Sequence, residues 1–262
     1  MPTLKENYGP WALVTGASAG IGEAYVKRLA AEGFNIVATA RRQDRLARLC
    51  QEIEKQYGIL TLAIAEDLSE PEGSKRLVDA VSELEIGLLV NNAGYGSNGY
   101  FHELDPEREA KMVILNCYAP IFITRALLPA MVNRKRGGVV FLSSVGANQP
   151  VPCSATYCAT KVFNQYMGEA LYEELKRNGI DVVAIQPGPT KTEFQENSDY
   201  VHDGNIRTAD DVVTTTLKTL GKKPVGIDGI RNKIMTIAAK TFPRRMVVSI
   251  SRHYALMHQK KK

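Results

Sequence analysis

Cysteine and histidine are both scarce in this chain of 262 residues, which contains four of each. The spacings between the cysteines fit no paired Cys-x-x-Cys pattern of the kind that binds zinc. Two histidines, His253 and His258, lie close together, but no acidic residue near them completes a ligand set. We therefore expect no bound metal. The four cysteines, which we expect to be reduced thiols, are Cys50, Cys117, Cys153 and Cys158.

Long apolar runs are absent as well. No run approaches the roughly 18 consecutive apolar residues of a membrane-spanning helix. The first seven residues, MPTLKEN, lack the apolar region of a secretory signal. Hydrophobic residues make up 44% of the chain and charged residues 23%, which is typical of a soluble folded protein and excludes a disordered or fibrous chain. The expected location is the cytoplasm or the cytosolic face of a membrane.

Acidic residues are missing from the last part of the chain. From Gly229 onward there are nine basic residues and no Asp or Glu. The rest of the chain contains the other 24 of the 33 Lys and Arg residues and all 28 acidic residues, so it is mildly acidic. Two amphipathic helices are expected there, separated by Pro243. Their apolar positions are Ile230, Ile234, Ile237 and Ala238 in the first helix, and Val247, Ile250 and Tyr254 in the second.

Three roles remain open for this basic extension, residues 230–262. The helices can cover a substrate pocket, or they can form a cationic surface that holds the protein against anionic lipid. Nucleic-acid binding is disfavoured, because the only aromatic side chains available for stacking are Phe242 and Tyr254 and no known reading motif is present.

Short apolar runs alternate with longer amphipathic stretches before this extension. The pattern predicts strands at residues 11–14, 35–40, 60–65, 87–90, 139–142 and 181–185, and helices at 21–32, 42–57, 71–84, 106–134 and 156–178. The strand runs are apolar throughout, as in strands covered on both faces. The expected fold is α/β, with a single doubly wound Rossmann-type domain built on a central parallel sheet over residues 1–229 and a C-terminal helical extension over 230–262. The polar stretch 191–207 fits either a mobile flap over a ligand crevice or a plain surface loop.

Three glycines follow the first predicted strand, in Thr15-Gly16-Ala17-Ser18-Ala19-Gly20-Ile21-Gly22, and a helix follows them. Glycines at such a bend let the backbone approach a pyrophosphate closely, and the N–H groups at the start of the helix stabilise its charge. A purely structural turn is the alternative. The position between a strand and a helix is what a dinucleotide site requires, so we expect a phosphate-binding turn.

Arg41 and Arg42 follow the second predicted strand. An acidic residue at this point, about 20 residues beyond the glycines, would bind the ribose 2′-hydroxyl of NAD. Here the first acid comes only at Asp44. Because two guanidinium groups match a 2′-phosphate, the sequence predicts NADP(H) as the cofactor. The alternative is that both arginines simply begin a solvated helix.

Tyr157 and Lys161 lie four residues apart in a predicted helix and therefore share one face. A second pair with this spacing, Tyr172 and Lys176, lies deeper in the same helix. Only Tyr157 begins the helix just after a loop, and the strand before that loop ends at Ser144. Reduction of a ketone places negative charge on its oxygen, so an acid must deliver a proton there. A phenol beside an ammonium group, with a hydroxyl that holds the carbonyl, suits this chemistry, and the ammonium is expected to lower the phenol pKa.

These residues resemble the short-chain dehydrogenase/reductase family in their order and approximate spacing. The resemblance covers about residues 8–195 and rests on Thr15-Gly16-x-x-x-Gly20-x-Gly22, Asn91-Asn92-Ala93-Gly94, Asn116, Ser144, Tyr157-x-x-x-Lys161 and Pro187-Gly188. It implies that Tyr157 is the acid/base and that Lys161 lowers its pKa and holds the nicotinamide ribose. It also implies that Ser144 positions the substrate carbonyl and that Asn116 supports a water-linked proton relay behind Lys161.

The resemblance further implies a set of cofactor contacts. Asp67 and Leu68 would flank the adenine, Asn92, Ala93 and Gly94 would line the cofactor, and Pro187, Gly188 and Thr192 would meet the nicotinamide. Members of the family commonly associate through the helices that correspond to 106–134 and 156–178, which implies a homodimer or homotetramer.

The function that the sequence favours is NADPH-dependent reduction of a ketone or aldehyde, in which Tyr157 supplies the proton. The expected pocket segments, 95–100, 145–153 and 194 onward, mix apolar and small residues without an obvious charge partner. A neutral apolar or lipid-like substrate is therefore favoured. An NAD-linked alcohol dehydrogenase and a non-catalytic cofactor-binding regulator are the alternatives.

Overall fold

A computed structural model describes residues 3–194 and 206–257 of the chain. Its centre is a seven-stranded sheet in the order β3-β2-β1-β4-β5-β6-β7, in which every neighbouring pair is parallel. The strands are β1 (Trp11–Thr15), β2 (Asn35–Ala40), β3 (Thr61–Ala65), β4 (Ile86–Asn91), β5 (Gly137–Leu142), β6 (Ile180–Gln186) and β7 (Val225–Ile227). The strand order changes direction at β1, so a crevice is expected at the carboxyl ends of β1 and β4.

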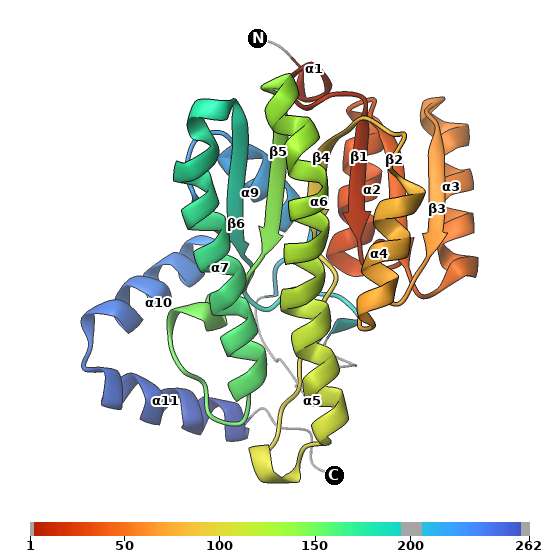
Figure 1. Cartoon of the computed structure of the whole chain (residues 1–262). Coiled ribbons are helices and arrows are strands. Elements are labelled where there is room, and N and C mark those ends of the chain that lie inside the picture. The colour runs from red at the N-terminus through yellow and green to blue at the C-terminus, as the bar shows by residue number, and fades with distance from the viewer. Residues whose placement is uncertain (1–2, 195–205, 258–262) are drawn as a thin grey trace.

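Helices cover both faces of the sheet (Figure 1). One face carries α2 (Gly20–Ala31), α3 (Gln43–Tyr57) and α9 (Ala209–Thr219), and the other carries α4 (Pro71–Ala80), α6 (Ala119–Arg134) and α7 (Ala155–Leu175). Each face has its own buried cluster: Tyr25, Leu46 and Val212 belong to the first, and Leu77, Ile123 and Leu175 to the second. The predicted doubly wound Rossmann-type fold is therefore confirmed.

The predicted helix 106–134 is continuous but not uniform. It consists of α5 (Pro106–Val113), a π-helical turn η2 (Ile114–Tyr118) and α6. By length and composition it is the one helix among the described residues that could cross a membrane. It packs here along the sheet, where Ala119, Ile123 and Met131 are buried in the core.

Three elements were not predicted from the sequence: α1 (Leu4–Tyr8), α9 and β7. The helix α9 contains the run Val-Val-Thr-Thr-Thr, whose β-branched residues disfavour a helix. It forms because Thr208 and Asp211 make a capping box and because Val212 and Val213 are buried against the sheet.

Several short elements connect these layers. They are the 3₁₀ turns η1 (Phe101–Glu103), η3 (Val145–Asn148) and η4 (Lys176–Asn178). The two ends of the stretch 191–207 lie side by side, because Thr190 and Arg207 form a parallel β-bridge. Arg207 also donates two hydrogen bonds, both of 2.9 Å, to the buried carboxylate of Asp228. The flap proposed for this stretch falls mainly on residues 195–205, which lie outside the described residues.

The C-terminal extension consists of α10 (Ile230–Thr241) and α11 (Arg244–Met257), which project from the body of the molecule beyond β7 (Figure 1). α10 packs on η3, where Thr236 is buried and Asn148 donates to its hydroxyl. The predicted apolar ridge of α10 faces outward: Ile230, Ile234 and Ile237 are 73%, 61% and 64% exposed.

Candidate active site

Thr15 joins the ends of the two central strands. Its hydroxyl accepts hydrogen bonds from the backbone N–H groups of Asn92 and Ala93, at 3.0 and 2.9 Å, and donates to the carbonyl of Val90. The Asn92 amide donates in turn to the carbonyl of Thr15 at 2.8 Å. The turn after β1 and the turn after β4 are thus held together at one edge of the sheet, where the sequence predicted the cofactor.

The glycines after β1 form a close-packed turn. Gly16 has a φ of 67°, and a Cβ atom there would lie 2.8 Å from the Asn92 amide nitrogen. A Cβ on Gly22 would lie 2.2 Å from the carbonyl oxygen of Gly16. No side chain in the described residues caps the start of α2, because the N-cap residue is Ala19. A narrow turn with uncapped helix N–H groups fits the pyrophosphate of a dinucleotide.

Arg42 connects this turn to the second strand. Its guanidinium donates to the hydroxyl of Ser18 at 3.2 and 3.1 Å, and its Nη1 donates to Glu193 at 2.8 Å. Arg41 is more exposed and lies 4.0 Å from the carboxylate of Asp67. Two guanidinium groups and a hydroxyl therefore lie beside the turn, and this donor set suits a phosphate on the ribose of a cofactor.

Ser144 and Tyr157 are brought together as predicted. Ser144 follows β5 and caps η3, since its hydroxyl accepts from the N–H of Gly146 at 3.1 Å. Tyr157 lies in the first turn of α7 and forms a hydrogen bond with Ser144. Burial raises the pKa of the Tyr157 phenol, and the bond to Ser144 opposes this effect only in part. The phenol is accordingly protonated at neutral pH.

Lys161 lies one turn further along α7 and is buried. Its ammonium donates to the carbonyl of Leu142 at 2.8 Å and lies 5.7 Å from the centre of the Tyr157 ring. Burial lowers the Lys161 pKa to about 8. On balance the pKa of Tyr157 is raised in this structure and not lowered as expected, because burial is the largest influence on the phenol and the Lys161 ammonium is directed to a backbone carbonyl.

Asn116 is fully buried in the π-helical turn η2. Its amide donates to the carbonyl of Tyr95 at 3.0 Å and to the hydroxyl of Thr160 at 2.9 Å. Gly94 fits against this group: a Cβ there would lie 2.9 Å from the Asn116 Oδ1 atom and 3.4 Å from the Lys161 ammonium. Asn116 and Lys161 therefore lie close together beside Gly94, and π-turns are frequent at functional sites. The water-linked proton relay stays a prediction.

The remaining predicted cofactor residues lie near the same edge, with one difference. Thr192 packs over Gly20, where a Cβ would be 3.0 Å from its side chain, and the carbonyl of Pro187 accepts from the N–H of Val145. Gly188 lies against Asn232 of α10. The side chain of Leu68 is buried in the core, so only its backbone can reach a cofactor.

One residue at the site, Glu193, was missed by the sequence analysis, whereas Phe194 begins a segment that was expected to shape the substrate pocket. The carboxylate of Glu193 forms ion pairs with two arginines, Arg42 at 2.8 Å and Arg45 at 2.5 Å. The ring of Phe194 lies 5.6 Å from the ring of Tyr157, centre to centre. No local pattern marks Glu193, because its partner Arg42 is distant in the sequence.

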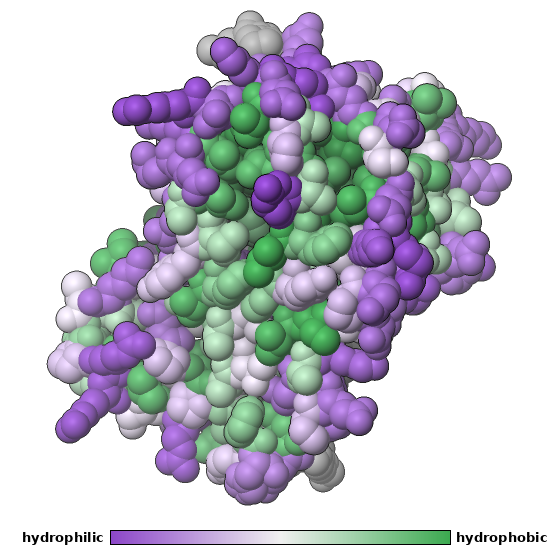
Figure 2. Space-filling model, in the orientation of Figure 1, coloured by the Kyte–Doolittle hydropathy of each residue, from purple (hydrophilic) through white to green (hydrophobic). Residues whose placement is uncertain are grey.

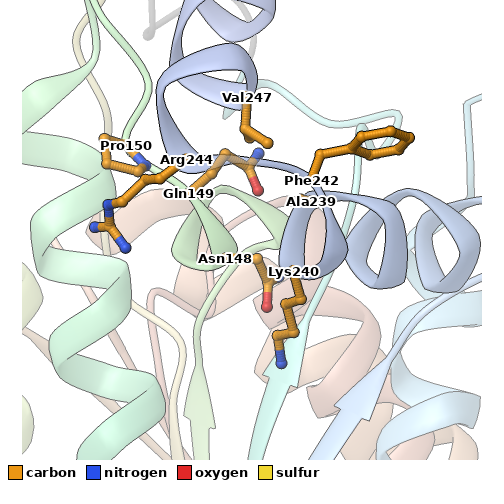
Figure 3. A pocket seen from close by; sticks show the side chains of 8 residues that line it. All are labelled: Asn148, Gln149, Pro150, Ala239, Lys240, Phe242, Arg244 and Val247. Atoms are coloured by element: carbon orange, nitrogen blue, oxygen red, sulfur yellow. The ribbon is translucent and has the colours of Figure 1, made fainter.

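A pocket of about 240 Å³ opens between the end of η3 and the helices α10 and α11 (Figure 3). One wall is formed by residues 148–150, at the end of η3, and the other by α10 and α11 with the turn between them. The second wall combines the apolar Phe242 and Val247 with the cations Lys240 and Arg244. Among the described residues there is no group of three His, Cys, Asp or Glu side chains that could hold a metal.

The chain matches the family model of the short chain dehydrogenases over residues 10–201. It is 33% identical over 247 residues to the very-long-chain 3-oxoacyl-CoA reductase of Mus musculus, covering 92% of this chain and 78% of that protein. The structure of a 7β-hydroxysteroid dehydrogenase superposes with a TM-score of 0.88 at 28% identity, covering 95% of this chain and 99% of the other.

Two further structures contain different nicotinamide cofactors. A short-chain dehydrogenase from Sphingobium yanoikuyae in complex with NADPH has a TM-score of 0.79 at 29% identity and covers 88% of this chain and 94% of its own. A 3-ketoacyl-(acyl-carrier-protein) reductase from Brucella melitensis complexed with NADH has a TM-score of 0.73 at 28% identity. The match covers 83% of this chain and 95% of that protein's chain. With the geometry described above, these findings establish that the chain belongs to the short-chain dehydrogenase/reductase family and is an oxidoreductase that acts on CH–OH or C=O groups with a nicotinamide cofactor.

Proposed function

We propose that this protein reduces an apolar, lipid-like ketone with NADPH. The observation that carries the proposal is the convergence of Ser144, Tyr157, Lys161 and Asn116 behind a phosphate-binding turn. A non-catalytic regulator would not need these four side chains to be grouped. The cofactor, when bound, supplies the hydride, and the protein must supply the proton and hold the carbonyl oxygen.

The protonated phenol of Tyr157 is suited to the reductive direction. Burial keeps its proton in place at neutral pH, so the group is ready to donate it to the carbonyl oxygen as negative charge develops there. Ser144, the hydrogen-bond partner of Tyr157, is placed to donate to the same oxygen. The ammonium of Lys161 stabilises the phenolate left behind, because it lies next to the ring.

NADPH is proposed as the reductant because of Arg41, Arg42 and Ser18. A thermal-shift titration with NADP and NAD tests this directly, since a ligand at 100 times its dissociation constant stabilises a fold by about 2.7 kcal/mol. We expect the larger shift with NADP, and we expect Arg42→Gln to remove the difference. Arg48→Gln, on the exposed side of α3, is the matched control. A larger shift with NAD would favour the alternative of an NAD-linked alcohol dehydrogenase.

The proposed substrate class rests on the names of the relatives, a 3-oxoacyl-CoA reductase and a hydroxysteroid dehydrogenase. The test is NADPH oxidation with 3-oxoacyl-CoA thioesters of increasing chain length, a ketosteroid and a small water-soluble aldehyde. We expect kcat/KM to rise with the apolar size of the ketone. Equal or higher values for the small aldehyde would contradict the lipid-like substrate.

The proposal includes a homodimer or homotetramer that works in the cytoplasm or at the cytosolic face of a membrane, without a nucleic-acid partner. Support for the oligomer comes from exposed large side chains on α5, η2, α6 and α7, namely Val113, Tyr118, Ile121 and Tyr166. Figure 2 shows green patches over this face of the molecule.

A further inference from the structure

The helices α10 and α11 carry a concentration of exposed apolar side chains. Sixteen large apolar side chains are exposed among the described residues, and eight of them lie between Ile230 and Tyr254. This stretch is a small fraction of the chain, so the density is far above that of the remaining surface. Soluble proteins rarely gather exposed apolar side chains in this way without a partner.

The apolar side chains of α10 form a ridge on its outer face. Ile230, Ile234 and Ile237 lie at positions i, i+4 and i+7, and all three are exposed. The inner face of α10 is polar or small: Asn232 donates to the carbonyl of Asp228 at 2.6 Å, and Thr236 is buried. The usual arrangement of an amphipathic helix on a protein core is therefore reversed.

The second helix continues this pattern. Met246 and Ile250 lie one turn apart on α11 and are exposed, whereas Ala255 is buried on the opposite side. Phe242, at the turn between the helices, is exposed, and its ring extends away from Asn148 (Figure 3). We call the outward-facing side chains Ile230, Ile234, Ile237, Phe242, Met246 and Ile250 the apolar ridge.

Cationic side chains flank the apolar ridge. At 3.6 residues per turn, Lys233 and Lys240 lie on one side of the α10 part of the ridge and Arg231 lies on the other. Arg244, Arg245 and Arg252 add three exposed cations on α11, and the sequence from Gly229 onward contains no acidic residue. Figure 2 shows the resulting mixture of hydrophobic and hydrophilic side chains over this part of the molecule.

We propose that the α10–α11 hairpin docks the protein on the surface of an anionic lipid bilayer. The apolar ridge enters the boundary between headgroups and acyl chains, while the flanking Lys and Arg side chains extend toward the phosphates. The charge of the hairpin is what selects this partner over a second copy of the chain, because two such hairpins would bring like charges together. The pocket between residues 148–150 and the α10–α11 hairpin lies on this same part of the molecule.

Flotation with vesicles tests this proposal, and it does not depend on the reaction. The full-length protein is mixed with vesicles of phosphatidylcholine alone or of phosphatidylcholine with phosphatidylserine. We expect flotation only with the anionic vesicles. In Lys233→Gln/Arg245→Gln the partition coefficient should fall roughly tenfold or more, since each cation near an anionic surface contributes to binding. High salt should have the same effect on the wild-type protein.

A second pair of variants tests the apolar ridge. Ile234→Gln/Ile237→Gln should lose flotation, whereas Leu60→Gln, at a site that is 63% exposed on another part of the surface, should float like the wild type. Arg48→Gln/Lys55→Gln on α3 is the control for charge. Retained thermal shifts with NADP establish that each variant is folded and distinguish a failure of docking from a failure of the proposed function.

Three results would overturn the proposal. The first is a wild-type protein that floats with neither kind of vesicle. The second is a ridge variant that floats as well as the wild type. The third is a change in oligomer size in Ile234→Gln/Ile237→Gln, measured by light scattering, because the apolar ridge would then be a contact between copies of the chain.

Discussion

The carboxylate of Glu193 accepts a hydrogen bond of 2.8 Å from Arg42, the residue that the sequence assigns to the 2′-phosphate of the cofactor. The next residue, Phe194, packs against the ring of Tyr157. Two neighbouring residues of the chain thus contact the cofactor arginine and the proton donor. The segment that follows β6 therefore lies across both parts of the site.

Glu193→Gln is expected to tighten NADP binding. The carboxylate competes with a 2′-phosphate for Arg42 and Arg45, and this competition ends when the charge is removed. Since the ion pair is partly exposed, we expect the dissociation constant of NADP to fall roughly two- to fivefold, with that of NAD unchanged. Fluorescence titration with the reduced cofactors measures both.

Glu85→Gln is the matched control for this experiment. Glu85 pairs with Arg136 at 2.6 Å, is similarly exposed and precedes β4 at the other end of the strand. It should leave both dissociation constants unchanged. Weaker NADP binding in Glu193→Gln would show instead that the carboxylate holds Arg42 in its binding position.

The pKa of Lys161, lowered to about 8 by burial, predicts a pH dependence of the reaction. Above this pH the ammonium loses its proton and no longer stabilises the phenolate of Tyr157, so kcat for reduction should fall as the pH rises through about 8. A pH–rate profile with no decrease up to pH 9 would contradict this role of Lys161.

The same pKa shift predicts how stability responds to Lys161→Met. The buried ammonium costs free energy at pH 7, because the pKa in the folded state lies below the ordinary value of 10.5. Between about pH 8 and 10.5 the unfolded chain binds more protons, so the free energy of unfolding of the wild type rises with pH. Lys161→Met should therefore be more stable at pH 7, by at most about 3 kcal/mol, and inactive. Denaturant unfolding at pH 7 and pH 10 measures the difference in the free energy of unfolding between the variant and the wild type. This difference should be smaller at pH 10. A variant that is less stable than the wild type at pH 7 would contradict the prediction.

The exposed apolar side chains on α6 and α7 predict an oligomer. Ile121 and Tyr166 are 41% and 66% exposed, and a charge at each should prevent association. Ile121→Glu/Tyr166→Glu should convert the wild-type oligomer to a monomer in size-exclusion chromatography with light scattering. Leu60→Glu is the control, and a wild-type protein that is monomeric at every concentration would contradict the prediction.

The core of the fold was predictable because its signals are local. The run Asn35–Ala40 is apolar between polar ends and forms β2 with the predicted bounds. In α3 the buried residues Leu46, Leu49 and Ile53 repeat with helical spacing. The helices α1 and α9 were missed although both begin with a capping box, which is also a local signal.

The candidate site was predictable where spacing along one element decides it. Tyr157 and Lys161 share a helix face, and Ser144 ends the neighbouring strand. The pairing of Glu193 with Arg42 joins residues 151 positions apart, which no local pattern reveals. The direction of the ridge on α10 was equally hidden, since periodicity defines an apolar face but not whether that face packs inward. The direction of the pKa shift of Tyr157 depends on burial, which only the assembled site determines.

The central claim is that Tyr157 donates the proton while Ser144, Lys161 and Asn116 support it. Tyr157→Phe keeps the ring against Phe194 and removes only the hydroxyl, so it tests this claim most directly. The measurement is NADPH oxidation with a 3-oxoacyl-CoA thioester, together with a fluorescence titration of NADPH binding. The account predicts that kcat falls at least about a hundredfold while the dissociation constant of NADPH stays nearly unchanged. Turnover close to that of the wild type would contradict it and remove Tyr157 from the mechanism.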